Sequence, residues 1–245
     1  MSDNIYQIIQ SILLAIIFAY LVYYVYTWLF EKNYQPKLWK QYLKEHKISK
    51  ALLAAEKKYK DKNRFFNFWF QVERLKDIPG AFAELGVYKG DSAYILHQMD
   101  PSREFHLFDT FKGFTEKDLA NETGKAATYT KHNFADTSIE HVRERLHSDR
   151  FVFHQGYFPD TTRELDTDIR FALVNMDADL YNPTKAGLEF FYPRLSPGGM
   201  IIIHDYNPDW PGIMKAVDQF AATIPEPIVP LTDKDSSVMI FKTHD

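Results

Sequence analysis

The 245-residue chain contains no cysteine, which excludes disulfide bonds, zinc–thiolate sites and a cysteine nucleophile. It also lacks an excess of positive charge: the net charge is −4, so a nucleic-acid partner is not expected. Charge of either sign is absent from Asn4 to Phe30. The remaining composition, 45% apolar and 25% charged, suffices for one sizeable α/β domain and an appendage.

The uncharged segment is long enough to cross a membrane. Between Ser11 and Phe30 the only non-aromatic polar residues are Ser11 and Thr27, and twenty helical residues span about 30 Å. Aromatic residues, which favour the membrane interface, lie near its two ends: Tyr6 at one, and Tyr23, Tyr24, Tyr26 and Trp28 at the other. A signal peptide fits less well, because a basic leader and a small-residue cleavage site are missing. We expect a single-pass anchor that meets the membrane through residues 5–30; a buried core helix and a hydrophobic dimerisation helix are the alternatives.

The segment that follows the apolar run is basic. From Lys32 to Arg64, eleven lysines and arginines face only three acidic residues. By the positive-inside tendency, the N-terminus should lie outside and everything after residue 31 in the cytoplasm. A helix is expected over residues 36–60, lying either on anionic headgroups or against the folded domain. The aromatic cluster in residues 65–70 is expected to pack on the domain or to cover a site.

The pattern changes after residue 80 to alternating strands and helices. Strands are predicted over residues 81–87, 104–109, 151–154, 169–176, 200–204, 228–231 and 238–242, and helices over 91–98, 138–147, from 183 onward, and 212–224. Such alternation predicts a mainly parallel sheet covered on both faces. Only residues 232–237 join the last two strands, which predicts an antiparallel hairpin at the sheet edge. The expected organisation is an anchor over residues 1–31, a basic helical linker over 32–77 and an α/β domain over 78–245.

A turn suited to a nucleotide follows the first predicted strand. Residues 84–90 read E-x-G-x-x-x-G, and glycines at Gly86 and Gly90 let the backbone approach a ligand and turn into a helix. The second strand ends in Asp109, where an acid holds a ribose diol in related folds; bracing a turn is its alternative role. Together these features favour an adenosine-containing cofactor. The G-x-G-x-x-G pattern expected for a pyrophosphate is missing.

Acidic residues also end the fourth and fifth predicted strands. Asp177 and Asp179 follow one strand, and His204 and Asp205 end the next. The carboxyl ends of neighbouring parallel strands meet, so these side chains should converge. Carboxylate ligands favour Mg²⁺, Mn²⁺ or Ca²⁺, while a histidine admits softer ions. Helix capping is the alternative role for each residue taken singly.

The segment Tyr181 to Lys185 matches the Y-x-x-x-K pattern of short-chain dehydrogenases. That pattern requires the tyrosine and the lysine on one helical face. Because Pro183 is expected to start the helix after a cap at Asn182, Tyr181 should lie outside it. A nicotinamide-dependent oxidoreductase is therefore a disfavoured alternative.

Five segments between residues 78 and 241 closely resemble, in order, the macrocin O-methyltransferase family, which modifies sugars of macrolide and aminocoumarin antibiotics. These segments are Glu84–Ser92, Leu107–Phe114, Met176–Thr184, Tyr192–Gly199 and Ile203–Tyr206. The resemblance implies a Rossmann-like, seven-stranded class I methyltransferase sheet, here with an N-terminal helical extension and one transmembrane helix. It also implies S-adenosylmethionine as methyl donor, a hydroxyl acceptor and a divalent metal, usually magnesium.

By position in that family, Asp177 and Asp205 match metal ligands and Asp179 matches the general base, with Asp177 as a second proton acceptor. His204 stands where metal-dependent members carry aspartate, so the predicted metal set is Asp177, His204 and Asp205, holding Mg²⁺ or Mn²⁺. The predicted cofactor contacts are Glu84, Gly86, Val87, Tyr88, Gly90, Ser92, Asp109, Thr110, Gly156, Tyr157 and Phe158.

The sequence thus predicts a membrane-tethered O-methyltransferase that acts on a hydroxyl of a small-molecule, sugar or lipid-linked acceptor. A catalytically silent S-adenosylmethionine-binding scaffold is the main alternative, motivated by His204 and the anchor. The sequence is also compatible with a homo-oligomer.

Overall fold

The computed structural model describes residues 2–30, 34–120, 122–163 and 165–244, which form two compact units, 1–49 and 50–245. The second unit begins at Lys50, so helices α3 (Lys50–Lys58) and α4 (Lys62–Arg74) belong to the same unit as the sheet. The predicted boundary between residues 31 and 32 lies outside the described residues. The predicted boundary at residue 78 falls within the second unit.

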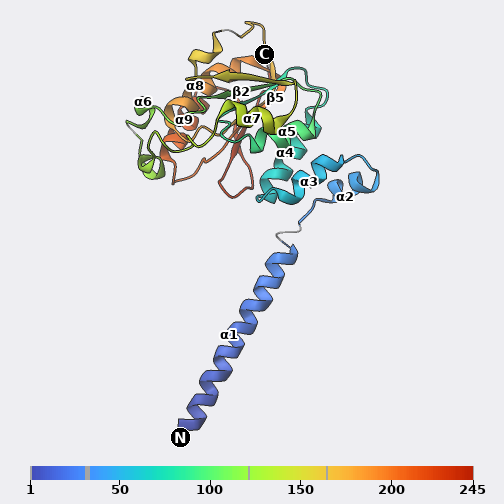
Figure 1. Ribbon diagram of the computed structural model, residues 1–245, viewed down its shortest axis with the longest axis vertical. Coiled ribbons are helices and arrows are strands. Elements are labelled where there is room, and N and C mark those ends of the chain that lie inside the picture. The colour runs from blue at the N-terminus through green and yellow to red at the C-terminus, as the bar shows by residue number, and fades with distance from the viewer. Residues whose placement is uncertain (1, 31–33, 121, 164, 245) are drawn as a thin grey trace. The chain divides into compact units, whose positions relative to one another are not determined.

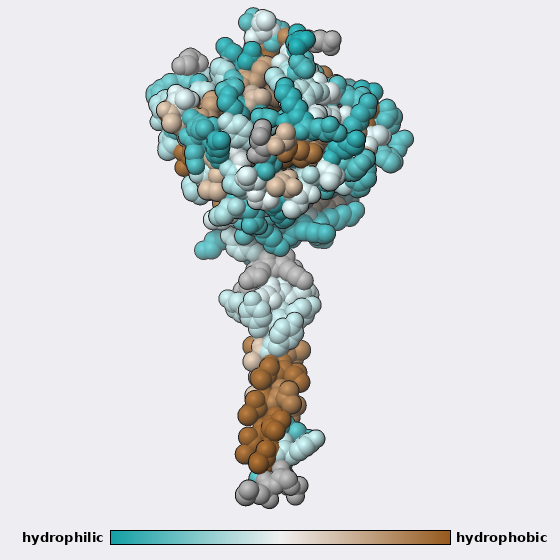
Figure 2. All heavy atoms as spheres, turned by 90° about the vertical axis from the view of Figure 1, so that its left-hand side faces the viewer, coloured by the Kyte–Doolittle hydropathy of each residue, from teal (hydrophilic) through white to brown (hydrophobic). Residues whose placement is uncertain are grey.

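The first unit contains α1 (Ser2–Phe30) and α2 (Lys37–Lys44). Helix α1 is continuous over 29 residues, and its described side chains are exposed apart from the half-buried Thr27 (Figure 1). Among the described residues, α1 is the one helix long and apolar enough to cross a membrane. Figure 2 shows brown, apolar side chains along the middle of α1, with paler side chains toward its C-terminal end. The single helix predicted over residues 36–60 is wrong: α2 and α3 are separate, because the positive φ of His46 ends the helical turn.

The second unit is built on a seven-stranded sheet in the order β3-β2-β1-β4-β5-β7-β6. The strands are β1 (Ala81–Leu85), β2 (Phe105–Asp109), β3 (Phe151–Gln155), β4 (Phe171–Met176), β5 (Leu195–Ile203), β6 (Ile228–Pro230) and β7 (Val238–Phe241). Strands β1 to β5 run parallel, whereas β7 is antiparallel to both β5 and β6. The predicted seven-stranded sheet with a terminal hairpin is confirmed. Strand β5 begins at Leu195, before its predicted start at residue 200, since Gly198 and Gly199 pair with Lys242 after β7.

Helices cover both faces of this sheet (Figure 1). On one face α8 (Tyr181–Phe191) and α9 (Pro211–Ala221) pack together over the main apolar core. On the other, α5 (Asp91–Met99) contacts α3, α4 and α7 (Ile139–Leu146). The connections contain the short α6 (Glu116–Leu119) and the 3₁₀ turns η1 (Gly124–Thr128), η2 (Asp160–Thr162) and η3 (Tyr192–Arg194).

One of two predicted helix starts is confirmed and the other is wrong. Helix α5 begins at Asp91, as predicted, and follows Gly90, which adopts the left-handed conformation with φ of 75°. Helix α8 begins at Tyr181, not at the proline, because the Glu122 carboxylate accepts the Tyr181 N–H at 2.6 Å and takes the place of a cap.

Tyr181 and Lys185 therefore share α8, contrary to the argument made from the proline. They nevertheless do not line the site cavity described below. The Tyr181 hydroxyl donates to Gln219 at 2.8 Å, and the Lys185 ammonium pairs with Glu189 on the same helix. The tyrosine and the lysine of the dehydrogenase-like pattern thus contact other side chains at the protein surface, not a ligand site.

Candidate active site at the carboxyl ends of the parallel strands

A cavity of about 490 Å³ opens at the carboxyl ends of the parallel strands, beside the point where the strand order reverses between β1 and β4. This volume is in the range of sites for cofactor-sized ligands. Ten of the eleven predicted cofactor residues line it; Gly90 does not, because it caps α5. The ten are Glu84, Gly86, Val87, Tyr88, Ser92, Asp109, Thr110, Gly156, Tyr157 and Phe158.

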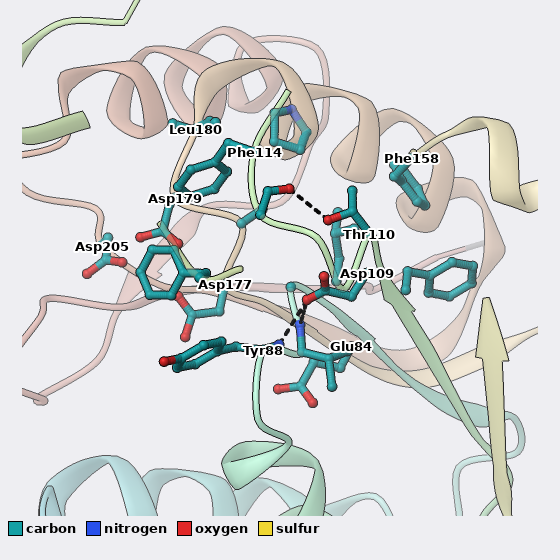
Figure 3. Close-up of a pocket in the computed structure, with 18 of the residues that line it drawn as sticks. Glu84, Tyr88, Asp109, Thr110, Phe114, Phe158, Asp177, Asp179, Leu180 and Asp205 are labelled. Atoms are coloured by element: carbon teal, nitrogen blue, oxygen red, sulfur yellow. Dashed lines mark hydrogen bonds between the residues drawn. The ribbon is translucent and has the colours of Figure 1, made fainter. Parts of the chain in front are cut away.

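The turn after β1 is held by Asp109. One oxygen of its carboxylate, Oδ2, accepts the N–H groups of Val87 and Tyr88 at 2.7 and 2.8 Å (Figure 3). The other, Oδ1, accepts the Phe111 N–H at 2.7 Å. Asp109 therefore braces the cofactor turn, the alternative role that the sequence left open, while still lining the cavity.

Glu84, the residue before the last in β1, is a buried acid at the floor of the cavity. Its Oε1 accepts a hydrogen bond from the Asn175 amide of β4 at 2.8 Å. Its Oε2 is buried and makes no hydrogen bond to any residue that the structure describes. Burial, followed by the charges of Asp177 and Asp109, raises the pKa of the Glu84 carboxyl well above its usual range, against the Asn175 hydrogen bond. A cationic ligand group would favour its ionised form.

Three carboxylates meet at one side of the cavity. Oxygens of Asp177, Asp179 and Asp205 lie within 4.8 Å of one another, as predicted from the strand ends (Figure 3). Asp179 and Asp205 both adopt a φ of 60°, a left-handed conformation that aspartate tolerates better than most residues. Burial, and then the charge of Asp177, raises the pKa of Asp205 to about 7 and that of Asp179 well above its usual range. Such crowded carboxylates require protons or a cation.

His204 does not join the three carboxylates. Its Nε2 lies 2.7 Å from the Asn175 carbonyl oxygen, and its Nδ1 lies 3.1 Å from the Ser237 hydroxyl. The Phe68 ring of α4 covers the imidazole edge-on at 5.8 Å between centroids. Burial lowers the pKa of His204, which favours the neutral ring. With both nitrogens engaged, the predicted ligand set of Asp177, His204 and Asp205 is not assembled. Consecutive residues at a strand end point to opposite sides, and Asp205 takes the cavity side.

Residues outside the predicted set complete the cavity wall. Tyr59 and Arg64, from the end of α3 and from α4, line it together with Asp235 of the β6–β7 loop. The Arg64 guanidinium pairs with Asp235 at 2.7 Å and approaches Asp233 at 3.5 Å. Burial alone would lower the pKa of Arg64, but the surrounding carboxylates raise it. The predicted aromatic cluster lies in α4, where Phe65, Phe66, Phe68 and Trp69 are buried.

The segment between β2 and α7 supplies a further, aromatic wall. Phe114 and Tyr129 stack with centroids 5.3 Å apart, and Phe134 packs edge-on against both. The buried Asp118 anchors this segment by accepting the Tyr157 hydroxyl at 2.9 Å and the Asn182 amide at 3.2 Å. The alternation of strands and helices in the sequence did not predict this aromatic wall, because the helical elements of the segment, α6 and η1, are only four and five residues long.

Known proteins resemble most of this chain. The family model of macrocin-O-methyltransferase (TylF) matches residues 37–241. The chain is 34% identical over 160 residues to an 8-demethyl-8-(2,3-dimethoxy-alpha-L-rhamnosyl)-tetracenomycin-C 4'-O-methyltransferase of Streptomyces olivaceus, covering 60% of this chain and 61% of that protein. It is 33% identical over 148 residues to a mycinamicin III 3''-O-methyltransferase of Micromonospora griseorubida, covering 54% and 58%.

The chain therefore spans about three fifths of the length of the curated relatives it matches. Among solved structures, the O-methyltransferase NovP matches with a TM-score of 0.65 and 25% identity, over 75% of this chain and 81% of that one. Calicheamicin methyltransferase CalS11, at 24% identity and a TM-score of 0.59, shares the fold over 73% of this chain and 78% of its own.

Proposed function

The chain belongs to the macrocin O-methyltransferase family, and we propose that it transfers a methyl group from S-adenosylmethionine to a hydroxyl of a small-molecule, sugar or lipid-linked acceptor. The observation that carries the proposal is the placement of three carboxylates, those of Asp177, Asp179 and Asp205, on a cavity that is also lined by the Glu84–Lys89 turn. Donor and acceptor can thus meet beside a group able to take a proton.

The donor side of the proposed site is the turn after β1 and the loop after β3. Gly86 lets the backbone approach the ligand, Asp109 holds the turn, and Gly156 to Phe158 would flank the adenine. Asp109 also remains the proposed partner of the ribose, since each carboxylate oxygen has more than one lone pair. When bound, S-adenosylmethionine supplies a methyl carbon activated by the positively charged sulfur.

Methyl transfer is then a displacement that depends on positioning. The acceptor oxygen forms a bond to the methyl carbon as the carbon–sulfur bond breaks, and the electron pair of that bond goes to sulfur. The hydroxyl proton goes to Asp179, with Asp177 as the second candidate. Burial and neighbouring charge raise the pKa of Asp179, which makes its carboxylate a stronger proton acceptor.

A divalent cation fits the three carboxylates, because they are hard oxygen donors crowded together with excess negative charge. We propose that Asp177 and Asp205 hold Mg²⁺ or Mn²⁺ and that Asp179, rather than His204, lies beside them. Such an ion would supply stabilisation of negative charge on the acceptor oxygen.

We also propose that α1 anchors the enzyme in a membrane, with residues after 31 in the cytoplasm. The support is the length of α1, the exposure of its apolar side chains and the basic segment that follows. An enzyme anchored in a membrane would meet lipid-linked acceptors readily, so lipid-linked molecules are among the proposed acceptors.

Binding and product analysis on the full chain in detergent would test the proposed activity. Calorimetry should show binding of S-adenosylmethionine and S-adenosylhomocysteine, and incubation with cell extract should give a product heavier by the mass of one methylene group. Tight binding of NAD with no response to either sulfur compound would contradict the proposal. Binding of the sulfur compounds without any methylated product, across extracts and candidate acceptors, would favour the scaffold alternative.

A further inference from the structure

Four buried polar residues form a chain of hydrogen bonds beneath the cavity, across neighbouring strands. Ser237, before β7, contacts His204, at the end of β5; His204 contacts Asn175 of β4, and Asn175 contacts Glu84 of β1. Their exposed fractions are 1%, 1%, 0% and 2% in that order. Glu84 and Asn175 are direct partners in the β1–β4 register. Strand pairing therefore sets the link between Glu84 and Asn175.

The hydrogen bonds in this chain have one direction. Glu84 Oε1 accepts a hydrogen bond from the Asn175 amide nitrogen at 2.8 Å, which fixes the orientation of the amide. The Asn175 carbonyl oxygen then faces His204 Nε2, which must carry a hydrogen to donate at 2.7 Å. In the neutral ring Nδ1 is left as an acceptor, and the Ser237 hydroxyl donates to it at 3.1 Å. All three hydrogen bonds therefore point in the same direction, from Ser237, which precedes β7, toward Glu84 in β1.

The series of hydrogen bonds ends at the Glu84 carboxylate, where one oxygen accepts a hydrogen bond and the other does not. Glu84 Oε1 takes the Asn175 hydrogen bond, while Oε2 is buried without a hydrogen-bond partner among the described residues. The N–H of Ala93 is near enough to favour the charged form but makes no hydrogen bond to Oε2. Because Glu84 lines the cavity, Oε2 is the atom left to meet a ligand. A buried carboxylate oxygen of this kind calls for a charged donor.

Under the proposed function, Glu84 Oε2 receives the ammonium group of the methyl donor's amino-acid portion. We propose that Ser237, His204 and Asn175 are positioning residues that orient Glu84 for this contact. The proposal rests on the function proposed above, and it gives His204 a role in donor binding in place of metal ligation. A fragment of the methyl donor that lacks the ammonium group should bind with the same affinity whether or not these hydrogen bonds are intact.

Two ligands separate this role from a purely structural one. S-adenosylhomocysteine carries the ammonium group, whereas 5'-methylthioadenosine keeps the adenosine and sulfur without it. In the full chain, Glu84→Gln and His204→Met should weaken S-adenosylhomocysteine binding about tenfold or more, because a charge-assisted hydrogen bond is lost or misdirected. Binding of 5'-methylthioadenosine should change less than twofold. His204→Gln, which keeps a donor toward Asn175, should restore most of the affinity.

Ser237→Ala tests the same series of hydrogen bonds while leaving the His204 ring in place. It should weaken S-adenosylhomocysteine binding while sparing 5'-methylthioadenosine. Ser196→Ala is the matched control, since Ser196 is equally buried and donates to the Pro79 carbonyl at 2.6 Å, away from the cavity wall. A ¹⁵N spectrum of the wild-type His204 ring should show the hydrogen on Nε2.

Equal loss of both ligands in these variants, or no loss of either, would overturn the positioning role, as would a hydrogen on Nδ1 alone. A wild-type chain that binds neither ligand would instead refute the proposed function, and with it the ammonium site. The ring spectrum separates the two failures, because it reports the hydrogen-bond direction without any ligand.

Discussion

The carbonyl oxygen of Asp177 occupies the place where a β-carbon on residue 86 would stand: an ideal Cβ built on Gly86 would lie 2.0 Å from it. The φ of Gly86 is 87°, a conformation that glycine adopts without strain. The two strand ends are bound together at this point, since the Asp177 N–H donates to the Leu85 carbonyl at 2.9 Å. The glycine of the turn thus allows the donor side and the carboxylates to approach each other.

Gly86→Ala should separate these strand ends and abolish donor binding. The clash is with backbone, which cannot move aside as a flexible side chain can. We expect a clear loss of thermal stability and no detectable heat of S-adenosylhomocysteine binding. Gly187→Ala is a suitable control, because Gly187 lies within helix α8, where alanine is favourable. Its new Cβ would meet mainly the flexible ends of the Met176 and Leu85 side chains. Retained binding in Gly86→Ala would show that the turn tolerates a shifted backbone.

Asp109→Ala should disorganise the donor turn without touching the three carboxylates. It removes the acceptor of two N–H groups in that turn and of the Phe111 N–H. We expect a loss of about 1–3 kcal/mol in unfolding free energy and at least tenfold weaker donor binding. Chemical denaturation and calorimetry would measure the two effects. Asp109→Asn should also be impaired, since an amide has only one oxygen for these three donors.

Substitution of Asp179 by asparagine should stop methyl transfer while donor binding persists. Asparagine keeps the shape of the side chain but cannot accept a proton, so the turnover rate should fall at least a hundredfold. Asp218→Asn is the control, because Asp218 accepts a hydrogen bond from Tyr206 in an exposed position. Full activity in Asp179→Asn would transfer the base role to Asp177.

A cation titration would test the metal assignment without relying on activity. Mn²⁺ or Mg²⁺ should raise the melting temperature of the wild-type chain, since an ion that binds only the folded state stabilises it. Asp177→Asn and Asp205→Asn should lose this response, whereas His204→Gln should keep it. Loss of the response in His204→Gln as well as in the two aspartate variants would restore the ligand set predicted from the sequence.

The positions of the strands and the meeting of the carboxylates were predictable because both follow from local patterns. Apolar runs locate the strands, and parallel strands bring Asp177 and Asp205 to one edge whatever their other contacts are. The role of His204 was not predictable in this way. Its partners lie 29 and 33 residues away, and only the finished register of β4, β5 and β7 brings Asn175 and Ser237 to its two nitrogens.

The start of α8 was missed for a similar reason. Local preference places a cap at Asn182 and a proline in the first turn, yet a carboxylate 59 residues away satisfies the Tyr181 N–H. Arg64 and Asp235 meet across 171 residues of sequence, so nothing in the helical segment marked Arg64 as part of a cavity. Composition indicated only that this segment is basic and aromatic.

Because the chain has no cysteine, single-cysteine variants can test the membrane orientation directly. Asn4→Cys and Lys57→Cys place one thiol on each side of the apolar segment, and both positions are exposed. A membrane-impermeant maleimide applied to intact cells should label Asn4→Cys and leave Lys57→Cys unlabelled until the cells are opened. The reverse pattern would contradict the cytoplasmic placement. Release of the chain from membranes by alkaline wash would contradict the anchor itself.

Acidification should remove a specific stabilising contact at the hairpin edge of the sheet. Glu226 accepts the Tyr192 hydroxyl, the Thr243 N–H at 3.0 Å and the Thr243 hydroxyl at 2.9 Å. Burial alone would raise the pKa of the Glu226 carboxyl, but these hydrogen bonds outweigh it and lower the pKa to about 2. The folded state therefore favours the ionised form, which ties η3 to the segments on either side of the β6–β7 hairpin.

A carboxyl whose pKa is lowered by folding stabilises the protein above its unfolded pKa of about 4.5, and that stabilisation is lost as the pH falls toward about 2. Glu226→Gln should therefore be less stable than wild type at pH 7, by about 1–3 kcal/mol. The difference should persist down to about pH 5 and shrink between pH 4.5 and 2.5. Unfolding by denaturant at several pH values would measure it, with Glu189→Gln, an exposed acid on α8, as control. A stability difference that did not change with pH would mean that packing of the side chain, rather than its charge, holds the hairpin edge in place.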